Sequence, residues 1–168
     1  MSQYDALEFA EVEVPSVLAA QMPSECGPDP AVISSAMRAA FEKLAGFLRQ
    51  HKLSPSGPPR AIYAAYGPQG VRFTVVMPIV APPAATRMIG PGFVKPLPAA
   101  KAMRFTHRGP YAELKNTYGQ ITEFLKAKGL MKTEADWSRY MPMWEEYLND
   151  PQTTPPADLR TYIYLPVA

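Results

Sequence analysis

The stretches FEKLAGFL at residues 41–48 and YGQITEFL at residues 118–125 have a similar order of apolar, polar and aromatic side chains. Their first residues, 41 and 118, are 77 positions apart. A second match, between Met-Pro-Ile at residues 77–79 and Leu-Pro-Val at residues 165–167, lies at an offset of 88 because the second half has a longer connection. Similarity between two parts of one chain is typical of a duplicated unit. The sequence therefore predicts a tandem duplication.

The length of the chain fits one domain that contains both copies. A chain of 168 residues corresponds to a single compact domain. We expect this domain to span residues 1–168 and to consist of two pseudo-symmetric halves, at about 8–82 and 98–168.

Both of the matching stretches lie in patterns that predict α-helices. Apolar residues recur there every three or four positions, which defines one apolar stripe along a helix. Asp29 is suited to cap the first helix, and Gly129 is suited to end the second. The pattern predicts helices over about residues 30–51 and 110–128.

The segments around the helices are rich in Val, Ile, Tyr and Phe, which favours strands. Gly67-Pro68-Gln69-Gly70 is a hairpin turn signal between two such runs. We expect strands over residues 9–20, 60–66, 71–80, 101–107, 143–148 and 160–167. Each half then has the order strand, helix, strand, strand. Two such halves predict an α+β fold with one antiparallel sheet, both helices on one face and a central ligand groove.

The composition excludes several classes of protein. Apolar residues make up 47%, so the chain can bury a core, but 20 prolines argue against an all-helical bundle. With one cysteine the chain cannot form an intrachain disulfide, so a reducing cytoplasm fits best. One cysteine and two histidines are also too few for a common structural zinc site. Prolines interrupt the longest apolar run, at residues 75–85, so we expect no membrane span. No phosphate-binding glycine loop is present, and we expect no cofactor.

The basic residues are concentrated in the middle of the chain. Residues 1–30 carry six acids and no base, whereas residues 31–110 carry eleven bases and one acid. Because these bases are scattered singly, they indicate a solvated surface more than a nucleic-acid patch. We therefore expect no direct reading of DNA, and an acidic protein partner is an alternative role for this region.

Four segments of the second half, taken in order, resemble the GyrI-like small-molecule-binding family. They are Gly-x-Tyr at residues 109–111, Glu-x-Tyr-x-x-Asp-Pro at 145–151, Pro-Pro-x-x-Leu-x-Thr at 155–161 and the closing Pro-Val at 166–167. The first half resembles the family only in its layout. This family includes the effector-binding domains of bacterial AraC-type and MerR-type transcription regulators.

The resemblance implies a central groove that binds a small hydrophobic or cationic molecule, with the Glu of Glu-x-Tyr, here Glu145, at its floor. The leading hypothesis is a standalone effector-binding-like domain. One alternative is a hydrolase of cyclopropane-bearing electrophilic genotoxins that uses Glu145 as its catalytic general base. Another is a regulator of a macromolecular partner such as gyrase.

The alternation of a strand also singles out Glu145. In a strand, Glu145 and Tyr147 point to one face, while Trp144 and Glu146 point to the other. A carboxylate facing an aromatic-lined groove is a costly unpaired charge, a general acid or base, or the counter-charge of a cationic ligand. Alternatively, both glutamates are surface charges on an edge strand. Glu146 is the alternative if the register is shifted by one residue.

Three tyrosines are the candidates to surround the ligand. Tyr147 shares the face of Glu145, and Tyr111 lies at the entrance of the second helix. Tyr63 lies in a first-half strand that we expect near the centre of the sheet. Aromatic rings can stack on a ligand or surround a cation. Tyr118 and Tyr164 are interpreted as core residues.

Overall fold

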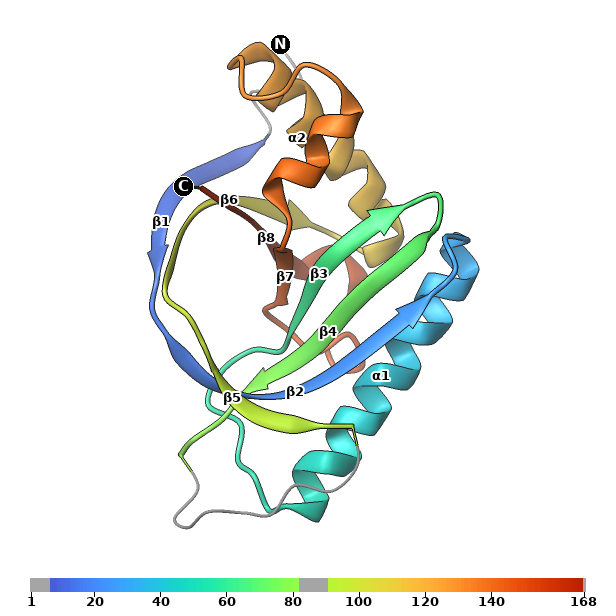
Figure 1. Cartoon of the computed structure of the whole chain (residues 1–168), viewed down its shortest axis with the longest axis vertical. Coiled ribbons are helices and arrows are strands. Elements are labelled where there is room, and N and C mark those ends of the chain that lie inside the picture. Colours follow the sequence, from blue (N-terminus) through green and yellow to red (C-terminus); the bar gives the residue numbers. More distant parts are fainter. Residues whose placement is uncertain (1–6, 82–90, 168) are drawn as a thin grey trace.

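The computed structural model describes residues 7–81 and 91–167, and within them eight antiparallel strands form one continuous sheet (Figure 1). Along the chain the main elements are β1 (Glu8–Val14), β2 (Val17–Cys26), α1 (Pro30–Gln50), β3 (Arg60–Gly67), β4 (Gly70–Pro78), β5 (Phe93–Leu97), β6 (Ala100–Arg108), α2 (Leu114–Ala127), β7 (Met143–Tyr147) and β8 (Arg160–Pro166). The 3₁₀ helices η2 (Tyr111–Glu113), η3 (Glu134–Tyr140) and η4 (Pro156–Asp158) lie in the connections of the second half. This is the α+β fold that the sequence predicted.

The two central strands of the sheet come from parts of the chain that are far apart in sequence. The order is β1-β6-β8-β7-β3-β4-β2-β5, with β3 and β7 paired at the centre. Outward from this pair, β4, β2 and β5 follow on one side, and β8, β6 and β1 follow on the other. The edge strands are exchanged: β1 pairs with β6, and β5 pairs with β2. Each edge strand is therefore paired with a strand that is distant from it in sequence.

The expectation of a single strand over residues 9–20 is wrong. The chain turns at Pro15 and Ser16, so that β1 and β2 pair in different parts of the sheet. Proline has no N–H to donate to a strand ladder, which favours a break here. The Ser16 hydroxyl donates a hydrogen bond of 2.8 Å to the carbonyl oxygen of Leu97. Strand β5 was not among the expected strands, and it lies at the edge of the sheet, where its Pro96 is tolerated.

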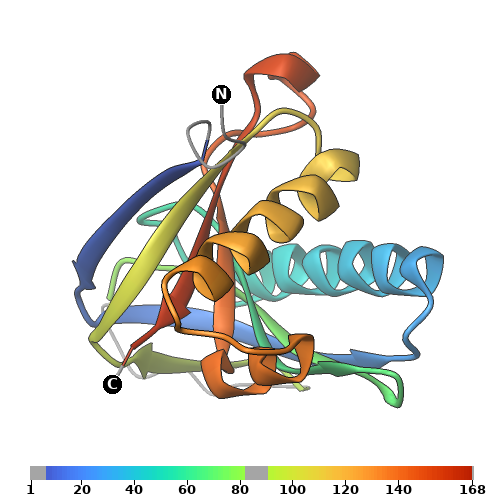
Figure 2. The ribbon, with the colours of Figure 1, turned by 90° about the horizontal axis from the view of Figure 1, so that it is seen from above.

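Both long helices lie on the same face of the sheet, as Figure 2 shows. The Asp29 side chain caps α1 by accepting a hydrogen bond of 2.8 Å from the N–H of Ala31. Helix α2 begins at Leu114 and not near residue 110, because η2 forms a separate 3₁₀ turn before it. Of the helices in the described residues, none is both long and apolar enough to cross a membrane.

The main core lies between the helices and the sheet. Leu44 of α1 and Ile121 of α2 are almost fully buried there, together with strand residues such as Phe105. A smaller cluster of Ala102, Trp144 and Tyr164 lies on the opposite face of the sheet. The central strand β7 is buried on both faces from Met143 to Glu146. Any charged side chain in this part of β7 is therefore shielded from water.

The hairpin that the sequence predicted joins β3 to β4. Gly67 pairs with Gly70 at its end. Gly70 has a φ angle of 136°, a region that residues with a Cβ rarely adopt, and a Cβ there would lie 2.7 Å from the carbonyl oxygen of Cys26. A Cβ on Gly67 would meet no heavy atom within 4 Å.

The substitution Gly70→Ala is expected to lower the free energy of unfolding by about 1–3 kcal/mol, because it combines backbone strain with a steric clash. The matched control Gly67→Ala is expected to change it by less than about 0.5 kcal/mol. Urea unfolding of both variants and the wild type checks this. Equal stability of the two variants would contradict the geometry of this turn.

Candidate functional site

Glu145 lies near the centre of the sheet with its side chain on the helix side. It belongs to β7, which lies between β8 and β3. Met143 and Tyr147, at alternate positions of β7, pack in the helix-side core, whereas Trp144 packs on the opposite face. Only 4% of Glu145 is exposed. Of the two glutamates that the sequence left as alternatives, Glu145 faces the helices and Glu146 faces away from them.

Three tyrosine hydroxyls donate hydrogen bonds to the Glu145 carboxylate. The Tyr147 hydroxyl lies 2.6 Å from Oε1, and that of Tyr63 on β3 lies 3.5 Å from the same oxygen. The hydroxyl of Tyr118 on α2 donates to Oε2. We call these four residues the Glu145 cluster. Both carboxylate oxygens are satisfied, by groups from two strands and a helix.

The protonation states of the cluster follow from its burial. Burial raises the pKa of Glu145 above its ordinary value of 4.5, although the three hydroxyls partly offset this by stabilising the carboxylate. Burial also raises the pKa of Tyr63, Tyr118 and Tyr147 well above 10.0. The tyrosines therefore remain hydrogen-bond donors at neutral pH. Glu145 takes up its charge at a higher pH than an exposed glutamate.

The Glu145 carboxylate has no ion pair within the described residues, and electrostatic attraction to His107 offsets the effect of burial on its pKa only in part. Glu146 on the opposite face differs: its Oε2 lies 3.4 Å from Nε of Arg60, and its Oε1 accepts a hydrogen bond of 2.9 Å from Tyr164. The interpretation of Tyr164 as a core residue was thus incomplete. Adjacent glutamates have opposite electrostatic surroundings.

Further aromatic rings surround the cluster on the helix side. The ring of Phe41 on α1 lies 6.0 Å from that of Tyr147, centroid to centroid, in an edge-on contact. Tyr111 lies 5.5 Å from Tyr147 in a similar contact, and Trp137 of η3 lies 5.8 Å from Tyr118. The buried carboxylate is therefore enclosed by aromatic groups from both helices, the sheet and η3.

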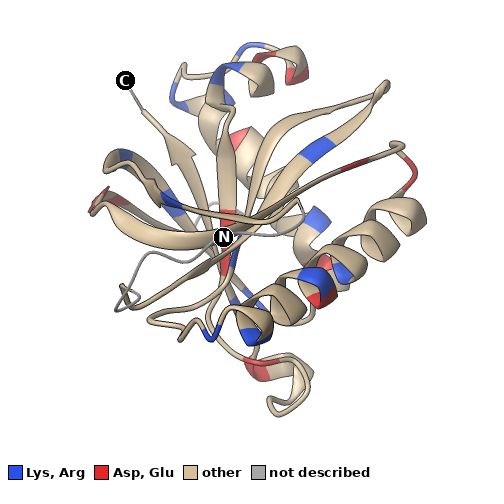
Figure 3. Cartoon of the chain, turned by 60° about the horizontal axis from the view of Figure 1, so that its bottom comes forward, with Lys and Arg blue, Asp and Glu red and all other residues tan. Residues whose placement is uncertain are grey.

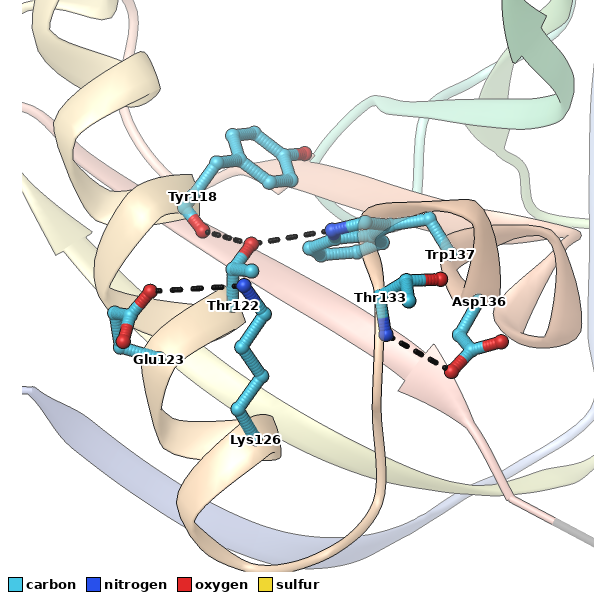
Figure 4. A network of polar contacts seen from close by, with 7 residues as sticks. All are labelled: Tyr118, Thr122, Glu123, Lys126, Thr133, Asp136 and Trp137. Atoms are coloured by element: carbon cyan, nitrogen blue, oxygen red, sulfur yellow. Dashed lines mark hydrogen bonds and ion pairs between the residues drawn. The ribbon is translucent and has the colours of Figure 1, made fainter.

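A small polar network fixes Tyr118 and Trp137 relative to each other (Figure 4). The Thr122 hydroxyl donates to the carbonyl oxygen of Tyr118 at 2.9 Å and accepts from the indole N–H of Trp137 at 3.1 Å. A capping box between Thr133 and Asp136 begins η3 and holds its first turn. The segment that carries Trp137 is thus joined to α2 by a side-chain hydrogen bond.

His107 lies on β6 and is buried, with both ring nitrogens in contact with protein groups. Nε2 lies 3.0 Å from the carbonyl oxygen of Pro110, and Nδ1 lies 2.6 Å from the hydroxyl oxygen of Thr117. Because a carbonyl only accepts hydrogen bonds, Nε2 carries a proton. In a neutral ring, Nδ1 then accepts from Thr117. Within the described residues, no group of three His, Cys, Asp or Glu side chains could hold a metal ion.

The sequence and the structure agree on part of this arrangement. Tyr63 and Tyr147 lie in the Glu145 cluster, whereas Tyr111 contacts Tyr147 and lies one layer further out. Tyr118 was interpreted as a core residue, but its hydroxyl bonds to Glu145. The internal repeat contained a signal for it, because an offset of 77 aligns Phe41 with Tyr118. Both helices present an aromatic ring at this equivalent position.

Two surface hollows of the protein do not include Glu145. One is lined by residues of β1 and β6 together with Leu130, Tyr140 and Val167. The other is lined by residues of β2, β3 and β4 near Arg72. In this conformation the aromatic side chains cover the carboxylate.

The raised pKa of Glu145 predicts a specific pH dependence of stability. A carboxyl group whose pKa is higher in the folded state than in the unfolded state binds its proton more tightly when folded. Its contribution to stability is therefore present below pH 4.5 and is lost as the pH rises through the folded-state value. We expect the stability of Glu145→Gln relative to the wild type to increase over this range, by at most about 1.4 kcal/mol per pH unit.

Urea unfolding of the two proteins between about pH 4 and 8 measures this difference, and other titrating groups cancel in the comparison. A difference that does not vary with pH would show that burial does not raise the Glu145 pKa.

Comparisons with known proteins place this fold in a family. The model of the GyrI-like small-molecule-binding domain matches residues 8–168. The comparison with curated proteins found no match. The crystal structure of the EcmrR C-terminal domain has a TM-score of 0.72 at 16% identity and covers 96% of this chain and 98% of that chain. In the cryo-EM structure of an EcmrR–DNA complex, EcmrR aligns with a TM-score of 0.73 at 17% identity, over 95% of this chain. The present chain spans only 57% of that EcmrR chain.

Two other solved structures share the fold at similar coverage. The structure of SAV2435 bound to tetraphenylphosphonium has a TM-score of 0.64 at 11% identity and covers 96% of this chain and 94% of that one. A hydrolase from Listeria innocua has a TM-score of 0.57 at 14% identity and covers 96% and 92%. At these identities the structures show a common fold alone. Because the family model matches nearly the whole sequence, this chain belongs to the family of GyrI-like small-molecule-binding domains.

Proposed function

We propose that this chain binds a small hydrophobic cation in a central groove between the helices, with Glu145 at the floor. The observation that carries the proposal is a buried carboxylate that has three neutral tyrosine donors and no basic partner among the described residues. A carboxylate removed from water is costly unless a positive charge compensates it. A cationic ligand would supply that charge.

The other glutamate of β7 supports this interpretation by contrast. Glu146 is also buried, but Arg60 lies close to its carboxylate and Tyr164 donates to it. Its charge is thus compensated within the protein. If Glu145 had a purely structural role, we would expect a similar basic partner within the protein.

The aromatic rings around Glu145 fit the same kind of ligand. Phe41, Tyr111 and Trp137 supply apolar faces beside the tyrosines of the Glu145 cluster. The face of an aromatic ring attracts cations, by about 2 kcal/mol or more where water is excluded. Rings and carboxylate together favour a ligand that is both apolar and positively charged.

Binding requires side chains to move, because only 4% of Glu145 is exposed. The contact between Tyr118 and Trp137 is a candidate place for opening. One hydrogen bond from Trp137 to Thr122 joins the two segments on this side. We infer that a ligand replaces at least one tyrosine hydroxyl beside the carboxylate.

The relatives support the proposal at the level of the ligand class. SAV2435, which shares this fold, has been solved with tetraphenylphosphonium, a hydrophobic cation. The EcmrR C-terminal domain, also of this fold, is part of a longer chain seen in a complex with DNA. By analogy with these proteins, we propose that the present chain binds an effector molecule in the cytoplasm.

We do not propose direct reading of DNA by this domain. Both long helices pack on the sheet, and neither belongs to a helix-turn-helix pair in the described residues. Lys and Arg are distributed over several elements of the described chain (Figure 3). An acidic protein partner remains the alternative use of the basic residues.

Titration with tetraphenylphosphonium chloride tests the cation proposal. We expect the wild type to bind it, and Glu145→Gln to weaken the affinity by about tenfold or more, since only the charge is lost. Isothermal titration calorimetry at neutral pH measures both affinities. Identical affinity of the two proteins would overturn the role of Glu145.

Two controls separate charge from shape. Glu146→Gln changes the neighbouring glutamate on the opposite face, and we expect it to leave the affinity unchanged. Triphenylphosphine oxide is a neutral aryl compound, and Glu145→Gln should not weaken its binding. A loss of affinity for the neutral compound would indicate damage to the pocket and not a missing charge.

A hydrolase that acts on a cyclopropane-bearing electrophile is the second candidate function. Burial raises the pKa of Glu145, which makes its carboxylate a stronger base, and a tyrosine hydroxyl that leaves Glu145 when a substrate binds would be able to donate to a substrate carbonyl. A hydrolase from Listeria innocua has the same fold. In this reaction Glu145 takes a proton from water, the water oxygen bonds to a ring carbon, and the ring C–C bond breaks. The electron pair moves to the adjacent carbonyl system, which is then protonated.

This candidate predicts multiple turnovers by the wild type and a rate at least about 100-fold lower for Glu145→Gln, the usual effect of losing a general base. Incubation with a cyclopropane-bearing enone, followed by mass spectrometry of the water adduct, measures the turnover. Product limited to one equivalent of the wild-type protein would exclude a catalytic function on this compound.

A further inference from the structure

Tyr66 reaches the face of the Glu145 cluster because of an irregularity in β3. In a regular strand, Tyr63 and Tyr66 would point to opposite faces, since they are an odd number of positions apart. The pairing of β3 with β4 shifts between Tyr63 and Ala65: Tyr63 lies opposite Phe73, and Tyr66 lies opposite Val71. Ala64 is the extra residue of a β-bulge. Bulges of this kind re-aim side chains, often next to functional sites.

The contacts of Tyr66 place its ring beside the cluster. Its centroid lies 6.2 Å from that of Tyr63 in an edge-on contact, with an angle of 68° between the rings. The ring of Tyr66 therefore packs against the ring of Tyr63, a member of the Glu145 cluster.

Tyr66 is not a member of the Glu145 cluster, and it is much more exposed than the neighbouring Tyr63. It is 60% exposed, whereas Tyr63 is 9% exposed. No side-chain hydrogen bond is recorded for its hydroxyl within the described part of the chain. A large ring held at the solvent side of a buried carboxylate, with no polar partner of its own, is positioned to contact a molecule that covers that carboxylate.

We propose that Tyr66 is a specificity-determining residue that favours aryl-bearing cations over aliphatic cations of the same charge. The inference rests on the proposed function, because it assumes that the cation lies over Glu145. Glu145 attracts any cation equally by its charge. Tyr66 adds an edge-on or stacked contact that only an aromatic ligand group can make in full. Such aromatic pairs change affinity by about 2- to 12-fold beyond simple burial.

Two phosphonium ions test this difference. Tetraphenylphosphonium carries four aryl groups, and tetrabutylphosphonium carries the same charge on flexible alkyl chains. We expect Tyr66→Ala to weaken tetraphenylphosphonium about 2- to 12-fold and to leave tetrabutylphosphonium within about twofold. Tyr66→Phe keeps the ring and should retain the wild-type preference. Equal loss for both cations, or no loss for either, would overturn the assignment.

The matched control is Tyr162→Ala, which removes a tyrosine that packs with the aromatic cluster on the opposite face of the sheet. It should leave the affinities for both cations unchanged. Glu145→Gln separates the proposed cation site from the role of Tyr66, because it should weaken the affinity for both cations. If the wild type binds neither cation, or Glu145→Gln changes neither affinity, the proposed function fails. If Glu145→Gln weakens both but Tyr66→Ala alters no preference, only the role of Tyr66 fails.

Discussion

The hydrogen bonds from three tyrosine hydroxyls to the buried carboxylate of Glu145 impose the strictest requirement on this structure. A charge-bearing group that is 4% exposed is stable there only if its oxygens have well-placed donors. The donors belong to β3, β7 and α2. The pairing of β3 with β7 and the position of α2 on the sheet must therefore bring all three hydroxyls within hydrogen-bond distance of the same carboxylate. All three donors are neutral, and no ion pair with Glu145 is present in the described part of the chain, which is the basis of the proposed ligand preference.

Burial of β7 on both faces gives its two adjacent glutamates different roles. Glu146 is compensated by Arg60 and Tyr164, so it can serve as part of the structure on its side of the sheet. Glu145 has only neutral donors. A register shift of one residue would exchange these surroundings completely, because successive side chains of a strand point to opposite faces. The stacked rings of Trp144 and Tyr164, with centroids 5.0 Å apart, help to hold the observed register.

The pairing of β3 with β7 explains why the cluster forms at the centre of the sheet. These two strands come from distant parts of the chain, so side chains from both parts meet there. Tyr63 comes from the first half, and Glu145, Tyr147 and Tyr118 come from the second. Phe41 of α1 occupies the position equivalent to Tyr118 and completes the aromatic surroundings from the other side. Neither half contains the cluster by itself.

The amino-acid sequence was sufficient to predict the α+β class, both helices and the hairpin at residues 67–70. These depend on local periodicity and turn chemistry, which neighbouring residues carry. The candidate carboxylate was predicted from the family resemblance and not from periodicity. Four features could be seen only in the folded chain: Glu145 and not Glu146 faces the helices, the Tyr118 hydroxyl reaches it, β1 and β5 pair with strands distant in sequence, and the bulge at Ala64 turns Tyr66 toward the cluster. Each of these depends on strand register or on partners distant in sequence, and a shift of one residue reverses which face a side chain occupies.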